Sequence, residues 1–96
     1  MKYELLLRGR AKADIRRAAK WYERQREGLG REFVAEVDTA LGRIEANPED
    51  YEVVHREIRQ AILRRFPYGV FYRIRAAKIS VFAVVHLKRD DIPWNV

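Results

Sequence analysis

The chain has 96 residues, a hydrophobic fraction of 48%, no cysteine and a formal net charge of +6. This length and composition predict a single folded domain over residues 1–96 and exclude a largely disordered chain, a disulfide scaffold, thiolate chemistry and cysteine-ligated metal sites. No apolar run approaches the roughly 18 residues that a membrane span needs, and the N-terminus lacks the apolar core of a secretory signal, so we expect a cytoplasmic protein.

The first predicted elements are a short strand and two amphipathic helices. Residues 3–8 alternate as a strand does. From residue 10 the apolar positions recur at helical spacing up to Gly28-Leu29-Gly30, which supplies a flexible connection. A second helix repeats this spacing until Asn47-Pro48, because the residue before a proline disfavours the helical conformation. The two helices form an antiparallel hairpin whose apolar stripes need a sheet to cover them.

Three strands are predicted to follow, at residues 59–66, 70–75 and 78–87, with tight turns between them. The fold class is therefore α+β: one strand, a helical hairpin, then a three-stranded antiparallel meander, with the helices packed on one face of the sheet. A two-residue turn at Ala76-Ala77 fixes the register. The expected pairs are Ile74–Ile79, Tyr72–Val81, Val70–Ala83, Leu63–Tyr72 and Ala61–Ile74.

The opposite face of this sheet is expected to mix aromatic side chains with arginines. Such a face suits nucleic acid, because bases stack on aromatic rings and arginine takes phosphate. The same aromatic residues could instead simply shield the back of a thin sheet. The residues assigned to this face are Ile62, Arg64, Phe71, Arg73, Phe82, Val84 and His86.

The positive charge is unevenly distributed along the sequence. The chain has 15 arginines and 5 lysines, and residues 58–89 hold eight of these bases and no acid. The remaining segments together carry twelve bases and fourteen acids, so we expect the positive field to come from residues 58–89. Such a field attracts nucleic acid or an acidic protein, although a merely solvated basic surface has the same composition.

Four stretches, in this order of elements, resemble the RelE/ParE superfamily of bacterial toxins. The resemblance covers essentially the whole chain, and its stretches are 11–15, 30–48, 64–74 and 81–89. It implies the toxin of a type II toxin–antitoxin system, associated with growth inhibition and plasmid stabilisation and masked by an acidic, partly disordered antitoxin. RelE-like members cut mRNA in the ribosomal A site, whereas ParE-like members poison DNA gyrase and do not cut RNA.

Metal-free RNA cleavage needs a group that activates the 2′-hydroxyl, a cation for the phosphorane and a proton donor. The candidates for these roles are Arg64, Arg73, His86 and Arg89. The sequence also departs from the RelE-like pattern: residues 61–63 are apolar, and Asp90 and Asp91 would repel a phosphate. A lone histidine at a strand end is also more often structural than catalytic.

The long helical hairpin resembles ParE-like toxins more closely, so gyrase inhibition by binding is the first hypothesis, and the chain is then not an enzyme. Its partner-binding candidates are Arg65, Phe71, Phe82 and Trp94. A ribosome-dependent mRNA endoribonuclease and a non-toxic basic nucleic-acid-binding module are the alternatives. We expect no cofactor and no metal, since His55 and His86 belong to separate elements.

Overall fold

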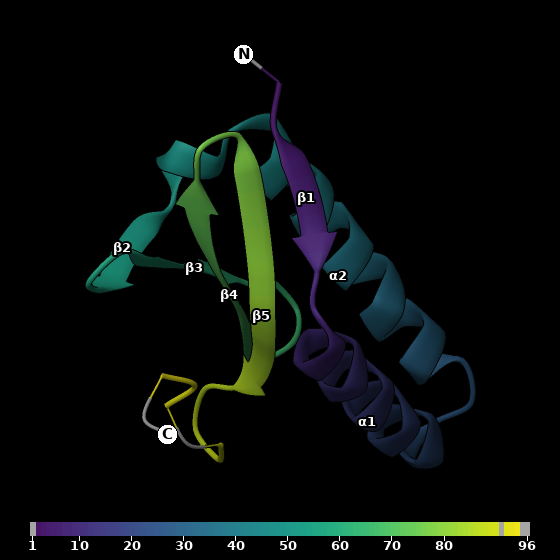
Figure 1. Cartoon of the computed structure of the whole chain (residues 1–96). Coiled ribbons are helices and arrows are strands. Elements are labelled where there is room, and N and C mark those ends of the chain that lie inside the picture. Colours follow the sequence, from purple (N-terminus) through teal and green to yellow (C-terminus); the bar gives the residue numbers. More distant parts are fainter. Residues whose placement is uncertain (1, 91, 95–96) are drawn as a thin grey trace.

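In the computed structural model, which describes residues 2–90 and 92–94, two helices pack on one face of a mixed sheet (Figure 1). The elements are β1 (Glu4–Leu7), α1 (Gly9–Gln25), α2 (Leu29–Ala46), the 3-10 turn η1 (Pro48–Asp50), β2 (Glu52–His55), β3 (Ile58–Ile62), β4 (Tyr68–Arg75) and β5 (Lys78–His86). The strand order is β1-β5-β4-β3-β2; β1 runs parallel to β5 and the other neighbours are antiparallel.

The predicted α+β class and the placement of the helices on one face are confirmed. The meander holds one strand more than expected, because β2 pairs with β3 at the outer edge of the sheet. This strand was missed because it is only four residues long and two of its residues are polar. A turn at Arg56, whose φ of 52° is left-handed, returns the chain into β3.

The helical hairpin closes through Glu23 of α1. Its carboxylate accepts the backbone N–H groups of Gly28 and Gly30 at 2.8 and 2.9 Å, which satisfies donors at the start of α2. Gly28 has a φ of 87°, a conformation that favours glycine. At Gly30 the helices touch so closely that a Cβ would lie 2.5 Å from the carbonyl oxygen of Ala19.

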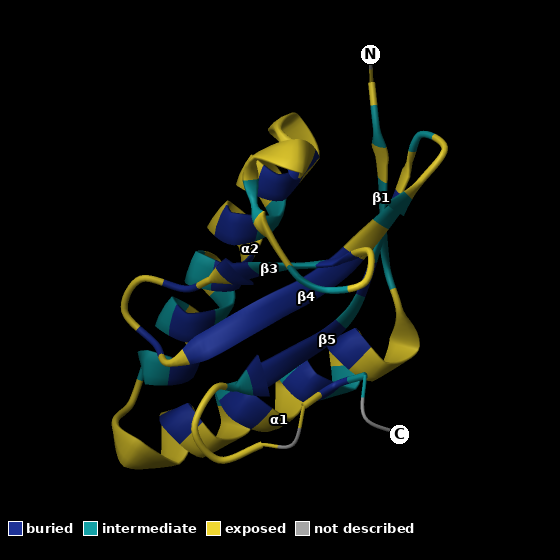
Figure 2. Ribbon diagram, turned by 90° about the vertical axis from the view of Figure 1, so that its left-hand side faces the viewer, coloured by how far each residue is buried: buried dark blue, intermediate teal, exposed yellow. Residues whose placement is uncertain are grey.

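The core lies between the helices and the central strands. Both β4 and β5 are buried along much of their length, and each helix turns a buried stripe toward them (Figure 2). The Tyr72 hydroxyl donates to the carbonyl oxygen of Pro48 at 2.6 Å, which anchors η1 to the middle of β4. The largest fully buried side chains are Tyr72, Phe33, Ile44, Ile79, Val37, Val70, Val81 and Val84.

A β-bulge at Phe82 interrupts the pairing of β4 with β5. On the turn side of the bulge the predicted pairs Ile74–Ile79 and Tyr72–Val81 are confirmed. Beyond it the predicted pair of Val70 with Ala83 is wrong, because the extra residue shifts the register and Val70 lies opposite Val84.

The bulge also exchanges the faces of the following residues. Val84, expected on the outer face, packs in the core beneath the helices. Ala83 and Val85 instead join Phe71 and Ile58 in a second, smaller cluster on the outer face. One inserted residue therefore reverses the alternation for the rest of β5.

The predicted register of β3 with β4 is wrong as well. Ala61 pairs with Val70, not with Ile74, and Arg59 takes the place expected for Leu63 opposite Tyr72. The cause is a longer connection: β3 ends at Ile62, and the chain turns before β4 begins. The shift is an even number of residues, so Ala61 and Leu63 still face the helices as predicted.

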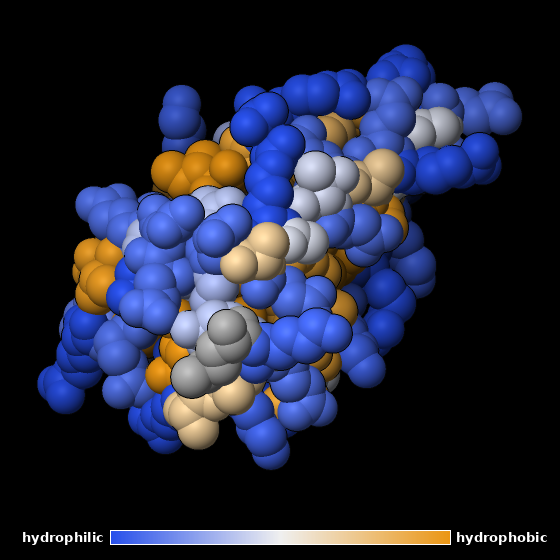
Figure 3. Space-filling model, turned by 90° about the horizontal axis from the view of Figure 1, so that it is seen from above, coloured by the Kyte–Doolittle hydropathy of each residue, from blue (hydrophilic) through white to orange (hydrophobic). Residues whose placement is uncertain are grey.

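The surface at the N-terminal end of the molecule is mainly hydrophilic, and its apolar side chains form small separate patches (Figure 3). Within the described residues, neither helix combines the length and the apolarity needed to cross a bilayer.

Candidate functional site

The four residues proposed for RNA cleavage occupy three different surroundings. Arg64 and Arg65 follow β3 and lie against α2, where the Glu36 carboxylate accepts both of their backbone N–H groups, that of Arg65 at 2.9 Å. The Arg65 guanidinium also donates to Glu32 at 2.8 Å. Because Glu32 and Glu36 line the same surface hollow as the two arginines, this corner does not form a purely cationic phosphate site.

Arg73 lies on the outer face of the sheet, away from the helices, with its guanidinium 5.8 Å from the centre of the Phe82 ring. Phe82 is partly buried there, whereas Phe71 is only 3% exposed and belongs to the second cluster. Trp94 folds back over this cluster and stacks on His55 with ring centres 4.8 Å apart. Of the partner-binding candidates on this face, Phe82 and Trp94 keep some surface and Phe71 has almost none.

His86 ends β5 and organises the turn that follows. Its Nδ1 accepts the backbone N–H groups of Lys88 and Arg89, each at 3.1 Å, and the backbone N–H of His86 donates to the Asp90 carboxylate at 2.7 Å. Burial lowers the pKa of the imidazole; the neighbouring Arg89 lowers it further and Asp90 opposes this. The neutral imidazole is therefore favoured, with Nδ1 already engaged as an acceptor.

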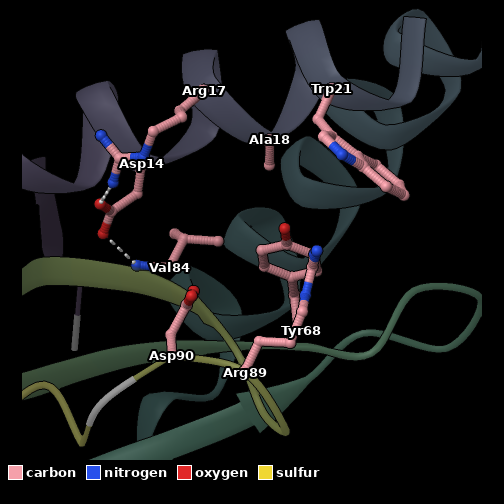
Figure 4. A pocket seen from close by; sticks show the side chains of 8 residues that line it. All are labelled: Asp14, Arg17, Ala18, Trp21, Tyr68, Val84, Arg89 and Asp90. Atoms are coloured by element: carbon pink, nitrogen blue, oxygen red, sulfur yellow. Dashed lines mark hydrogen bonds and ion pairs between the residues drawn. The ribbon is translucent and has the colours of Figure 1, made fainter. Parts of the chain in front are cut away.

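Arg89 points from that turn into a hollow of about 220 Å³ between α1 and the end of β5 (Figure 4). Its guanidinium lies 5.1 Å from the centre of the Trp21 ring, which is 38% exposed on α1. Tyr68 closes the hollow from β4, and burial raises the pKa of its hydroxyl. The lining residues are Asp14, Arg17, Ala18, Trp21, Tyr68, Val84, Arg89 and Asp90.

Asp14 is the one buried charged residue among those described, and it joins this hollow to the core. One carboxylate oxygen accepts the N–H of Val84 at 3.0 Å, and the other accepts the Arg17 guanidinium at 2.6 Å. Because β1 pairs with β5 only as far as Val81, the N–H of Val84 has no partner in β1, and Asp14 supplies one. Arg10 adds a longer ion pair at 3.5 Å.

The structure brings His86 and Arg89 together in the turn after β5, where only Arg89 lines this hollow, while Arg64 lies beside α2 and Arg73 on the outer face. Asp91, expected to repel a phosphate, lies outside the described residues. No group of histidine, aspartate and glutamate side chains within the described ranges is placed to hold a metal ion.

Sequence reasoning missed the two carboxylates that connect the helices to the sheet. Asp14 falls three residues after Ala11 on the buried stripe of α1, whereas Glu36 lies beside the stripe of α2 and is only partly buried. An acidic residue on a buried stripe needs a buried partner, so Asp14 could have been found from the sequence.

A second source of positive charge lies outside residues 58–89, in α1. The helix α1 carries six basic residues and only two acids, so residues 58–89 are not the sole origin of the positive field. The expectation failed because it pooled this helix with the acidic segments that follow it.

Comparison with known proteins agrees with this fold. Residues 5–91 match the sequence profile described as the ParE toxin of type II toxin–antitoxin system, parDE. Among solved structures, the chromosomal ParDE system from P. aeruginosa is similar with a TM-score of 0.82 and 13% identity, over 91% of this chain and 98% of that one. The toxin–antitoxin complex RelBE2 from Mycobacterium tuberculosis is similar with a TM-score of 0.62 and 20% identity, over 90% and 99% of the two chains. No curated protein sequence matched. The profile match spans most of the sequence, and the chain therefore belongs to the ParE toxin family of type II toxin–antitoxin systems.

Proposed function

We propose that this toxin inhibits DNA gyrase by binding and that a cognate acidic antitoxin neutralises it. We favour gyrase over RNA cleavage because the four residues proposed for RNA cleavage do not lie together in the structure. Arg64 packs beside acidic residues of α2, and Arg73 lies on the opposite face of the sheet. Only His86 and Arg89 are neighbours, and the imidazole Nδ1 is occupied by two backbone donors.

An activated 2′-hydroxyl, a cation at the phosphorane and a proton donor must converge on one phosphate. In this arrangement the arginine on the outer face and the arginine beside α2 cannot share a phosphate without a rearrangement of the sheet. Inhibition by binding needs only a contact surface and does not require several catalytic groups to converge on one phosphate. Both candidate targets, gyrase and the ribosome, are cytoplasmic, and this supports a cytoplasmic site of action.

Two observations support an acidic antitoxin as the partner of this chain: the proteins to which it is similar and its net charge. The similar solved structures are described as a ParDE toxin–antitoxin system and a RelBE2 toxin–antitoxin complex. The net charge of +6 favours an acidic partner. Arg65, Phe82 and Trp94 are the accessible candidates for its contacts.

The test is a plasmid supercoiling assay with purified gyrase, ATP and the chain freed of antitoxin. Inhibition with accumulation of cleaved plasmid is the expected result. The His86→Ala variant should inhibit as strongly as the unmodified chain, provided that circular dichroism shows it folded.

A second assay, mRNA cleavage on translating ribosomes, distinguishes the alternative. Cleavage by the unmodified chain that is lost in Arg64→Ala and Arg89→Ala, together with normal supercoiling, would overturn the proposal in favour of a ribosome-dependent endoribonuclease. Normal supercoiling, no cleavage and harmless expression without an antitoxin would instead favour a basic nucleic-acid-binding module.

A further inference from the structure

The solvent face of α1 is lined with basic side chains. Both acids of this helix are engaged elsewhere: Asp14 is buried against Val84, and Glu23 accepts two backbone N–H groups at the start of α2. Arg10 and Arg17 pair with Asp14. The other four basic side chains are exposed and form no ion pair among the described residues; these four, Lys12, Arg16, Lys20 and Arg24, are called here the basic face of α1.

The spacing of the basic face works against the stability of the helix. Its members recur every four residues, so each lies one turn from the next, and like charges at this spacing repel. The adjacent helix α2 is built differently, with four acids and two bases in its 18 residues. A helix that concentrates repelling cations on one face, opposite its buried stripe, is better explained by an anionic partner than by folding.

We propose that the basic face of α1 binds the phosphate backbone of duplex DNA in the B form. At about 1.5 Å per residue, Lys12 to Arg24 spans roughly 18 Å and presents a cation about every 6 Å. The major groove of B-DNA is about 12 Å wide, close to the diameter of an α-helix with its side chains. The deep, narrow major groove of an RNA duplex does not admit a helix in this way.

The basic face has no apolar or aromatic side chain of its own, and this also favours a nucleic-acid duplex as the partner. Protein interfaces bury apolar or aromatic anchors at their centre, and this face contributes none. Single-stranded nucleic acid is held by stacking on exposed aromatic rings. The exposed aromatic residue of α1, Trp21, is already in contact with Arg89 and Tyr22. Phosphate contacts alone therefore fit the chemistry of this face.

This inference goes beyond gyrase inhibition and does not depend on it, since DNA binding is measured without gyrase. The test compares two variants of matched composition and net charge. The first replaces the basic face: Lys12→Gln, Arg16→Gln, Lys20→Gln and Arg24→Gln. The control removes two lysines and two arginines elsewhere, all of them exposed: Lys2→Gln, Arg31→Gln, Arg43→Gln and Lys78→Gln.

Binding is measured by fluorescence anisotropy with a labelled DNA duplex of arbitrary sequence, at salt concentrations from 50 to 200 mM. Each phosphate contact contributes about −0.9 to the slope of log affinity against log salt, so loss of four contacts reduces the slope by about 3.6. Over this fourfold change in salt, the affinity of the unmodified chain should therefore fall about 150-fold more than that of the first variant. The control should keep the slope of the unmodified chain.

Circular dichroism establishes that both variants are folded, and glutamine is compatible with a helix. Equal slopes for the two variants would overturn the proposal, because the loss would then reflect net charge alone. Poly-glutamate is added as a competitor at the same concentration of charges as the DNA. If it displaces the DNA, the proposal is overturned, and the basic face of α1 binds an acidic protein instead. Binding of single-stranded DNA or of an RNA duplex as tight as that of the DNA duplex would refute the choice of B-form DNA.

Discussion

Replacing Asp14 with alanine tests how α1 is joined to the sheet. The carboxylate accepts the N–H of Val84, which is 2% exposed, so its removal leaves a buried donor without a partner. An unsatisfied buried donor costs about 1–3 kcal/mol. The Arg17 partner is largely exposed, and such a pair contributes about 0–1 kcal/mol. We therefore expect Asp14→Ala to lower the free energy of unfolding by about 1–4 kcal/mol.

The measurement is urea unfolding followed by circular dichroism, with thermal unfolding as a second readout. For a domain of this size, 1 kcal/mol corresponds to roughly 4–8 °C in Tm. Asp38→Ala is the matched control, because it makes the same replacement at an exposed position within α2. Asp14→Asn keeps an oxygen acceptor for Val84 and should lie between the two. If Asp14→Ala and Asp38→Ala are equally stable within about 0.5 kcal/mol, the carboxylate does not join α1 to β5 as described.

Three further predictions concern the turn after β5, the core and the hairpin. Acidification should destabilise the protein through His86: its pKa is lowered in the fold, so the unfolded chain binds the proton more readily, and stability falls as the pH drops below about 6.5. Tyr72→Phe should cost about 1 kcal/mol, because the buried carbonyl oxygen of Pro48 loses its donor. Gly30→Ala should destabilise by about 1–3 kcal/mol through overpacking, whereas Gly42→Ala, which meets nothing within 4 Å, should stabilise by about 0.5–1 kcal/mol.

Each of these has its own control. His86→Asn keeps an acceptor without a titration, so urea unfolding between pH 5 and 7.5 should give a flatter profile; parallel profiles would contradict the role given to the imidazole. Tyr51→Phe changes a half-buried tyrosine with no hydroxyl hydrogen bond among the described residues, and an equal loss at both positions would remove the argument for Tyr72. For the glycines, equal effects at the two positions would contradict the close contact at Gly30.

The sequence predicted the helices well because their signal is local. Apolar spacing, the glycines near residue 28 and the Asn47-Pro48 stop all act within a few residues, and the observed helices end within two or three residues of these positions. Strand pairing is less local. The register of β4 with β5 was predicted correctly near the turn, but the prediction is wrong beyond Phe82. The residue types from Val81 to Val85 give no sign of an extra residue in the strand.

The candidate site was predicted less well for a related reason. Arg64, Arg73 and Arg89 were grouped because they are cations near the ends of strands, and only the folded chain reveals that they face different surroundings. The sequence places Asp14 as an acid on an apolar stripe, but its partner, the N–H of Val84, lies 70 residues away. Local patterns carry no information about such a pair.

The parallel pairing of β1 with β5 has a consequence for synthesis of the protein. Within the sheet, the first strand in chain order pairs with the last one, since Glu4 to Leu7 lie beside Lys78 to Val81. The helical hairpin can form early from local contacts, yet the sheet is incomplete until β5 has emerged from the ribosome. A nascent chain that stops before residue 78 has neither the partner of β1 nor the donor that Asp14 binds. Formation of the complete sheet is thereby tied to the synthesis of β5.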